Sequence, residues 1–215
     1  MEIKLIRHGE MAGDPFICPA PGVSGCLSKK GIEDAQKARL ALSSTKLTHI
    51  FSSPYGRALQ TAEIATEGKG LDIEILDYIF EWQPNRQLEV LPSTEATKIR
   101  DAYANIPLDE MWKTELGEGT FEMLHRIGPP FLKRLAKLGL KRELSFFRKA
   151  TELPEETSIA VFAHGGSLNI LAGFLLNLPI LPTGFFSFDH AGILTIKFDK
   201  AKDVYLPKIH CPAFR

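Results

Sequence analysis

The sequence predicts an α/β fold with three layers, in which helices cover both faces of a mostly parallel central sheet. Short apolar or alternating segments that are typical of strands recur along the chain, and amphipathic segments with helical spacing separate them. The 215 residues, 44% hydrophobic and 24% charged, have ordinary globular composition. Since no internal repeat or low-complexity linker interrupts this pattern, we expect one domain over residues 1–215.

The first third of the chain predicts three strands and two helices. Alternation or apolar content marks strands at residues 2–6, 47–51 and 71–75, and a Gly/Pro-rich loop fills residues 13–25. The first helix follows Ser28, which suits an N-cap, and its apolar residues recur at helical spacing (Ile32, Ala35, Ala38 and Leu42). The second helix spans residues 55–65, with Ser53 as its N-cap and Pro54 at its first position.

The remainder of the chain is less regular. The weak pattern of residues 81–119 indicates a lid or insertion, with short helices at 95–104 and 109–115. A helical face follows from Phe121 to Leu138, and we expect Pro129-Pro130 to kink or split this helix because proline removes a donor and clashes with the preceding turn. We then expect a charged connection at 141–156, a buried strand at 158–163, a helix at 167–176 and a last strand at 192–198.

Charge and hydropathy exclude several classes of partner. The 26 basic and 26 acidic residues cancel, and no basic stripe is present, so we expect neither nucleic acid nor a membrane surface as a partner. No apolar run reaches the ~18 residues of a membrane span, and the N-terminus does not have the pattern of a signal peptide. The three unpatterned cysteines favour a reducing cytoplasm.

Three of the predicted strands end in polar motifs that could share one site. These motifs are Arg7-His8-Gly9-Glu10, Ser52-Ser53-Pro54 followed by Arg57, and His164-Gly165-Gly166. In open α/β sheets ligands bind at the carboxyl ends of the strands, so the three motifs are expected to converge.

The converging residues suit phosphate chemistry. Two guanidinium groups offer forked donors that match phosphate oxygens, and a helix N-terminus adds backbone donors. A neutral imidazole can attack phosphorus while a second imidazole stabilises the transferred group. Phosphoryl transfer depends mostly on such positioning and charge neutralisation, so this arrangement requires neither a metal nor a cofactor.

The same motifs, in chain order, resemble those of the histidine phosphatase superfamily, the phosphoglycerate mutase-like proteins. The resemblance also includes Gln60-Thr61-Ala62 and the entry to the first helix at residues 27–31 with Gln36, and it covers nearly the whole chain. It implies that His8 becomes phosphohistidine and that Glu81 is the general acid. It further implies that Arg7, Arg57 and His164, together with Gly165, form the phosphate pocket.

The acid assignment also has a reason in the sequence. In the acid-phosphatase branch of the family, an aspartate proton donor follows the second histidine, but here that position is Gly165. The donor must then come from elsewhere, and the other branch supplies a glutamate from the loop after the third strand, where Glu81 lies. Glu10 and Glu118 are the alternatives.

Departures from the family pattern concern the substrate. Residues 11–14 read Met-Ala-Gly-Asp where the family often has Thr-x-Trp-Asn, and the carboxylate of Asp14 would repel a phosphate unless it is turned away or protonated. Residues 82–86 replace the usual glycine and tryptophan after the acid, and the basic, proline-containing insert of the glycolytic mutases has no counterpart. His190, just before the last strand, could border the pocket.

These observations favour a metal-independent phosphatase that hydrolyses a phosphomonoester of a small metabolite through phospho-His8. A phosphomutase of the phosphoglycerate mutase type and a non-catalytic phosphate-binding protein are the alternatives. An α/β-hydrolase is disfavoured because no Gly-x-Ser-x-Gly occurs, and a metalloenzyme because neither His-x-His nor His-Glu-x-x-His occurs. The oligomeric state stays open.

Overall fold

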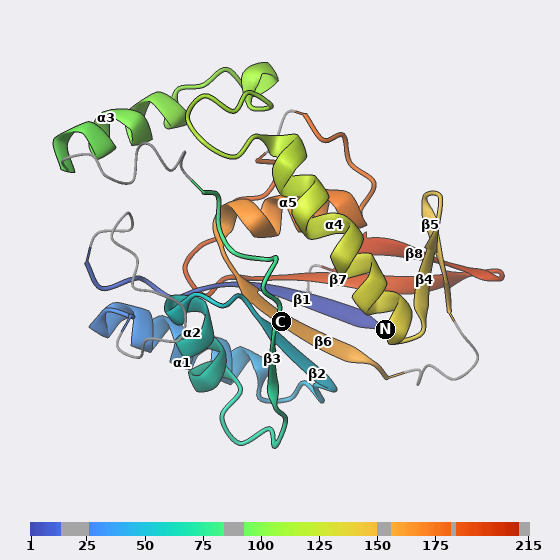
Figure 1. The fold of residues 1–215 in the computed structure, drawn as a ribbon. Helices are drawn as coiled ribbons and strands as arrows, with labels where there is room; N and C mark the ends of the chain where they lie inside the picture. Colours follow the sequence, from blue (N-terminus) through green and yellow to red (C-terminus); the bar gives the residue numbers. More distant parts are fainter. Residues whose placement is uncertain (14–25, 84–92, 150–155, 182–183, 211–215) are drawn as a thin grey trace.

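A single mixed sheet of eight strands organises the computed structural model, which describes residues 1–13, 26–83, 93–149, 156–181 and 184–210 (Figure 1). The strand order across the sheet is β3-β2-β6-β1-β7-β8-β5-β4. The strands are β1 (Glu2–Arg7), β2 (His49–Ser52), β3 (Ile73–Ile75), β4 (Leu140–Glu143), β5 (Phe146–Lys149), β6 (Ser158–Ala163), β7 (Ile193–Ala201) and β8 (Val204–Ile209).

The half of the sheet that carries the three motifs is parallel. β1 and β2 both pair with β6 in parallel, and β3 adds to the outer edge of β2. The register places Arg7 opposite Ala163 and Ser52 opposite Phe162, so the three central strands end at nearly the same level. His8, Ser53 and His164 therefore emerge together at one edge, as the sequence predicts.

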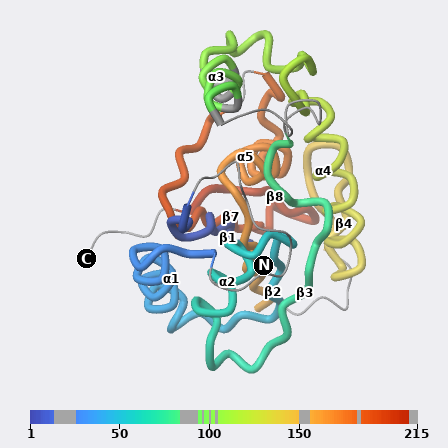
Figure 2. The backbone as a smooth tube through the Cα atoms, turned by 60° about the vertical axis from the view of Figure 1, so that its left-hand side comes forward, coloured from blue at the N-terminus to red at the C-terminus, as the bar shows by residue number. Residues whose placement is uncertain are grey.

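Helices cover both faces of the sheet, which confirms the predicted three layers (Figures 1 and 2). Helices α1 (Lys29–Leu42) and α2 (Gly56–Ala65) pack on one face, and α4 (Thr120–Lys137) and α5 (Gly165–Leu175) pack on the other. Helix α3 (Ser93–Ala104) and the short 3₁₀ helix η2 (Leu108–Glu110) lie beyond the sheet, at the top of Figure 1. Ser28 caps α1 as predicted, its hydroxyl accepting a hydrogen bond from the Gly31 N–H.

Alternation of side chains along the central strands supplies both layers of the core. Ile159 and Val161 of β6 face α4 and α5, whereas Ala160 and Phe162 face α1 and α2. All six residues of β6 are buried, because a parallel central strand is covered on both faces. This explains why the segment reads as a continuous apolar run rather than as a polar–apolar alternation.

Most of the antiparallel half of the sheet was not predicted, although its strand β7 corresponds to the last strand expected at 192–198. Where the sequence indicated a charged connection over residues 141–156, β4 and β5 form a hairpin, and β5 pairs with the unpredicted β8. Leu140 and Phe147 face the core while lysine and arginine side chains point outward, so charge on the solvent face obscures the strand signal. Together with the antiparallel β7, these strands make the sheet mixed.

We expected Pro129-Pro130 to kink or split this helix, and α4 is not split, because it runs uninterrupted through both prolines. The two prolines deprive the carbonyls of His125 and Arg126 of their usual helical donors. Ile127, Phe131 and Leu135, all fully buried, nevertheless hold the helix against the sheet on both sides of the proline pair. Tertiary packing therefore outweighs the local preference of proline.

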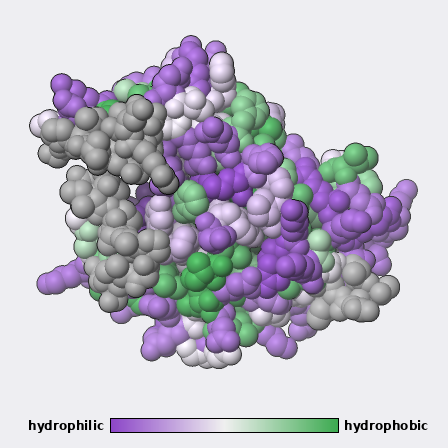
Figure 3. Space-filling model, viewed as in Figure 1, coloured by the Kyte–Doolittle hydropathy of each residue, from purple (hydrophilic) through white to green (hydrophobic). Residues whose placement is uncertain are grey.

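The surface shown in Figure 3 is mostly hydrophilic, with smaller apolar patches between the charged side chains. Within the described ranges, no helix combines the length and the apolar character that crossing a membrane requires.

Candidate active site

Two histidines and an arginine meet at the carboxyl edge of the parallel strands. His8 follows β1 and His164 follows β6, and their ring centroids lie 5.1 Å apart. Arg57, in the first turn of α2, places its Nε–H 3.2 Å from His8 Nε2 and 3.2 Å from His164 Nδ1. All three side chains are buried, so the arrangement is closed to bulk water on most sides.

The hydrogen bonds assign the proton on each imidazole. The carbonyl of Gly9 lies 2.7 Å from His8 Nδ1, and because a carbonyl only accepts, Nδ1 must carry the proton. His8 Nε2 then keeps its lone pair and accepts from Arg57. His164 likewise accepts from Arg57 at Nδ1, so its Nε2–H donates to the Ser53 hydroxyl at 2.8 Å. Both rings are therefore neutral.

Burial and neighbouring charge keep these rings neutral. Burial lowers the pKa of His8 to about 3, with further lowering from Arg57 and Arg7, while the Gly9 carbonyl opposes the shift. Burial and the charge of Arg57 also lower the pKa of His164 well below its usual range. At neutral pH, His8 therefore presents an unprotonated nitrogen, the form that can act as a nucleophile.

Arg7 extends the positive side of this site. Its Nη1–H donates to the carbonyl of Phe188 at 2.6 Å, and burial lowers its pKa while the charge of Glu81 opposes this shift. Its Nε is buried and has no hydrogen-bond partner among the described residues. A buried N–H without a partner is costly, so this position is prepared for an acceptor such as a phosphate oxygen.

Glu81 lies in the segment that follows β3, beside the first turn of α5. One oxygen accepts from the Gly166 N–H at 3.0 Å, and the other accepts from the N–H groups of Ser167 and Trp82, at 3.1 and 2.9 Å. A Cβ at Gly166 would approach Glu81 Oε1 to 2.5 Å, so any other residue there would displace the Glu81 carboxyl. The negative carboxylate thus sits at the positive end of α5, where the helix dipole stabilises it, close enough to influence Arg7.

The other two candidate acids are occupied elsewhere. Glu10 accepts from the Ser28 hydroxyl and from Lys30, at 2.8 and 3.0 Å. Both oxygens of Glu118 accept from Arg126 at 2.6 Å. Of the three glutamates, Glu81 is thus the one hydrogen-bonded to the N-terminal turn that follows His164.

The other residues that the sequence indicated lie either beside the histidines or outside the described residues. His190 borders the site as anticipated, with its ring centroid 5.8 Å from that of His8. Burial and the charge of Arg7 lower the pKa of His190, whereas Glu10 opposes this shift. Asp14 and residues 84–86 lie outside the described residues. Gly165 begins α5, and a Cβ there would lie 3.8 Å from Arg7 Nε, which is ordinary contact.

The predicted N-cap role of Ser53 is wrong. Helix α2 begins at Gly56 with Tyr55 in the cap position, and the Ser53 hydroxyl instead bonds to His164 Nε2. Sequence reasoning favoured the cap because serine before proline is a common helix start. The partner across the sheet, 111 residues later, leaves no local signal.

Thr61 is a residue whose role the sequence reasoning missed. Its hydroxyl accepts from the Gly9 N–H at 3.0 Å and donates to the Arg57 carbonyl at 2.7 Å. Thr61 therefore joins the loop after His8 to the helix that carries Arg57. The motif Gln60-Thr61-Ala62 was the available signal, although it assigned no function to the hydroxyl.

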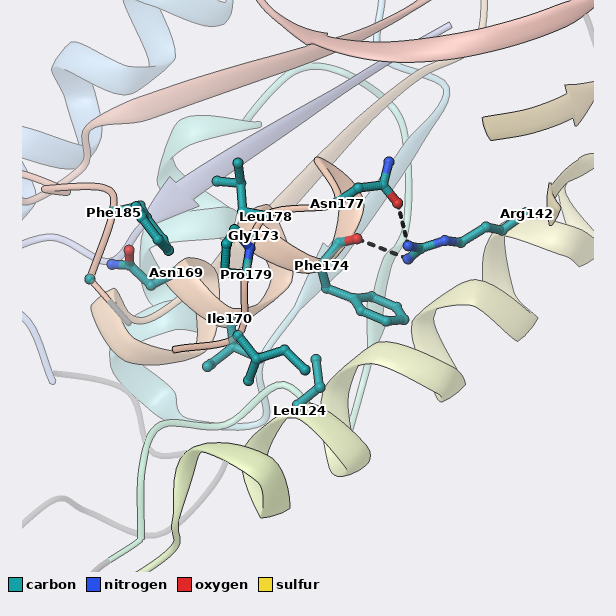
Figure 4. Close-up of a pocket in the computed structure, with 12 residues that line it drawn as sticks. Leu124, Arg142, Asn169, Ile170, Gly173, Phe174, Asn177, Leu178, Pro179 and Phe185 are labelled. Atoms are coloured by element: carbon teal, nitrogen blue, oxygen red, sulfur yellow. Dashed lines mark hydrogen bonds between the residues drawn. The ribbon is translucent and has the colours of Figure 1, made fainter. Parts of the chain in front are cut away.

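A separate cavity of about 250 Å³ lies along α5 (Figure 4), and neither His8 nor His164 is among its described lining residues. Its walls are mainly apolar and include Ile170, Phe174 and Phe185. Asn169 links this wall to the site, because its amide donates to the carbonyls of Gly165 and Phe186 and accepts from the Phe186 N–H. The cavity wall thus helps to fix the segment that leads to Phe188, the partner of Arg7.

No group of three or more histidine, cysteine, aspartate or glutamate side chains suited to hold a metal occurs in the described part of the chain.

Solved structures with the same fold include phosphatases. A mycobacterial glucosyl-3-phosphoglycerate phosphatase, solved as a complex with VO3, superposes with a TM-score of 0.69 at 20% identity, covering 98% of this chain and 97% of its own. A putative alpha-ribazole-5'-P phosphatase from Escherichia coli gives a TM-score of 0.64 at 20% identity, covering 97% and 95%.

The curated relatives are named as probable phosphoglycerate mutases rather than as phosphatases. A probable phosphoglycerate mutase GpmB of Escherichia fergusonii is 26% identical over 179 residues, which cover 83% of this chain and 76% of the relative. The corresponding protein of Yersinia pestis is 27% identical with the same coverage. The family model of the histidine phosphatase superfamily (branch 1) matches residues 3–206, and the chain therefore belongs to this superfamily.

Proposed function

We propose that this protein is a metal-independent phosphatase that hydrolyses the phosphomonoester of a small metabolite through a phosphohistidine at His8. One observation carries the proposal. The buried Nε–H of Arg7, which has no partner among the described residues, lies in the same site as His8, whose unprotonated Nε2 faces Arg57. A phosphate bound there would satisfy the open donor, meet two positive charges and lie beside a neutral nucleophile.

The reaction would proceed in two transfers. In the first, His8 Nε2 attacks phosphorus, the ester P–O bond breaks, and the Glu81 carboxyl, protonated in the complex with the anionic substrate, gives its proton to the leaving oxygen. In the second, water attacks the phosphorus of phospho-His8, the Glu81 carboxylate takes the proton from that water, and the P–N bond breaks. Inorganic phosphate leaves, and His8 returns to its neutral form.

The arginines and His164 would stabilise the transferring group. Arg7 and Arg57 supply two fixed positive charges against the phosphoryl oxygens, as metal ions do in other phosphoryl-transfer sites. In its present tautomer, His164 donates its single ring N–H to the Ser53 hydroxyl. It could donate to a phosphate only after this hydrogen bond breaks. We therefore assign His164 a role in orienting Arg57 and in contacting the transferred group after the bond to Ser53 adjusts.

A phosphomutase is the second candidate, because the curated relatives are named as probable phosphoglycerate mutases. In that reaction the phosphoryl group on His8 would return to the substrate rather than pass to water. The phosphatase names of the structural neighbours and the missing basic insert favour hydrolysis. A purely phosphate-binding protein is less favoured, since both histidines and both arginines are present.

The first prediction concerns the covalent step. Rapid quenching with labelled substrate should trap a phosphoryl group on His8, which acid then releases because the P–N bond of phosphohistidine is acid-labile. His8→Ala should lose both the label and turnover, whereas His210→Ala, at an exposed position just after β8, should keep both. Full activity of His8→Ala would end the proposal, and an isomerised substrate without released phosphate would establish the mutase.

The second prediction concerns charge neutralisation. Arg57→Ala should reduce turnover by about 10³-fold, by analogy with other arginines that stabilise a transferring phosphoryl group. Arg39→Ala, which removes an exposed arginine at the end of α1, should leave turnover unchanged. EDTA should also have little effect on the wild-type rate. A large loss with EDTA that zinc or magnesium restores would point instead to a metallophosphatase.

The third prediction concerns proton donation by Glu81. An alkoxide needs a proton as it leaves, whereas p-nitrophenolate does not, and general acid catalysis typically contributes ~10²–10⁴-fold. Glu81→Gln should therefore slow an alkyl phosphate much more than p-nitrophenyl phosphate. Glu63→Gln, exposed on α2, is the matched control. Equal slowing of both esters would make Glu81 a structural residue.

A further inference from the structure

The turn that carries Glu81 has no regular secondary structure of its own. β3 ends at Ile75, and residues 76–83 cross the end of the sheet without forming a helix or strand. A general acid must nevertheless be held within hydrogen-bond reach of the atom that it protonates. Contacts from other parts of the chain must therefore fix this turn.

Arg126 of α4 provides the most extensive of these contacts. Its Nη1 donates to the carbonyls of Tyr78 and Phe80, at 2.7 and 3.2 Å, on the two sides of Ile79 and just before Glu81. The guanidinium also lies over the Phe80 ring, 3.7 Å from its centroid. Arg126 thus contacts both the backbone and the Phe80 side chain of the turn that precedes the acid.

Glu118 holds Arg126 in this position. Its carboxylate accepts from Nε and Nη2 at 2.6 Å each, in the bidentate geometry that fixes a guanidinium plane. The two side chains are only 17% and 13% exposed, so solvent screens the pair weakly. The forked pair leaves Nη1 directed at the turn.

The segment around Glu118 also contacts the residues that follow Glu81. The Trp82 indole N–H donates to the Glu118 carbonyl at 2.8 Å, and the Glu118 N–H donates to the Gln83 carbonyl at 2.9 Å. The Trp82 ring lies against Gly117, where a Cβ would approach it to 2.3 Å. Both ends of the predicted insertion, residues 81–119, are therefore bound to one another beside the acid.

We propose that Arg126 and Glu118 are positioning residues for the general acid, and that their ion pair fixes the carboxyl of Glu81 toward the leaving group. The inference rests on the proposed function, since it gives Glu81 the role of proton donor. It also changes the interpretation of Glu118 from an alternative acid to a support of the acid. The carboxyl then holds its place through the pair on one side and through Gly166 and Ser167 on the other.

Two variants test this inference in the full-length protein. Arg126→Lys keeps the charge but loses the fork and the planar contact with Phe80. The double variant Arg126→Gln with Glu118→Gln removes both charges, so that no unpaired carboxylate remains buried. Thermal unfolding of each variant should be recorded first, and Arg126→Lys decides the matter if the double variant does not fold.

Helix α4 also carries a matched control. Arg134 donates to Glu74 with Nε and Nη2, its Nε lying 2.8 Å from the carboxylate, and its guanidinium lies 5.0 Å from the Phe51 ring centroid. This pair has the same chemistry as the Arg126–Glu118 pair, two turns further along the helix. Arg134→Gln with Glu74→Gln should therefore reproduce any general effect of losing such a pair.

Rates with an alkyl phosphate and with p-nitrophenyl phosphate give the readout. Because a placed general acid contributes about 10²–10⁴-fold, we expect both Arg126 variants to slow the alkyl ester by about tenfold or more. The rate with the activated ester should change by less than about twofold, and His8 should still be labelled. The control pair should change the rates with the two esters by the same factor. In a Glu81→Gln background the Arg126 variants should add no further selectivity between the esters.

The possible failures are distinguishable. Equal slowing of both esters, or wild-type rates, in the Arg126 variants would overturn the inference when wild-type His8 is labelled and Glu81→Gln discriminates between the esters. An unlabelled wild-type His8 would instead overturn the proposed function. The same selective slowing of the alkyl ester in the Arg134 control would also contradict a specific role for Arg126.

Discussion

The site depends on one buried guanidinium that lies between two imidazoles. Arg57 donates toward His8 Nε2 and His164 Nδ1 at the same distance of 3.2 Å, and its charge helps to hold the pKa of each ring below its ordinary value. A protonated ring at either position would face this cation in a closed space, with Arg7 close by. The arrangement therefore enforces neutral histidines, and it concentrates positive charge where the parallel strands end.

This concentration of charge has a structural cost that a ligand would offset. Within the described part of the chain, the buried Nε–H of Arg7 has no partner, and burial lowers the pKa of Arg7. Glu81 supplies the nearest balancing charge, but its oxygens are engaged by the N-terminal turn of α5 and by Trp82. A phosphate group would provide both an acceptor for this N–H and a balancing negative charge, which supports the proposed phosphate site.

The sequence predicted the parts of the molecule whose causes are local. Period-two and helical spacing located the strands and helices of the parallel half, and the residues after those strands identified His8 and His164. The sequence did not predict features that depend on partners far away along the chain. The Ser53 hydroxyl bonds to a residue on another strand, the β4–β5 hairpin is obscured by its solvent-facing charges, and α4 passes through two prolines because its buried face holds it.

The same distinction explains why Arg126 was not recognised. An arginine on an amphipathic helix is normally a solvated surface residue, and nothing in its neighbourhood along the chain indicates a role. Its partners are Glu118, before the helix, and the carbonyls of Tyr78 and Phe80, nearly fifty residues earlier. Backbone carbonyls have no sequence signature, so only the folded structure could reveal this contact.

Nuclear magnetic resonance of the His8 ring nitrogens tests the central claim most directly. The protein is labelled with ¹⁵N, and the signals of His8 are assigned by comparison with His8→Gln. We predict a proton on Nδ1 and an unprotonated Nε2. The chemical shifts of both nitrogens should stay constant from about pH 8 to about pH 5, because the pKa of His8 is lowered to about 3. A titration centred near the ordinary value of 6.5, or a proton on Nε2, would contradict this claim.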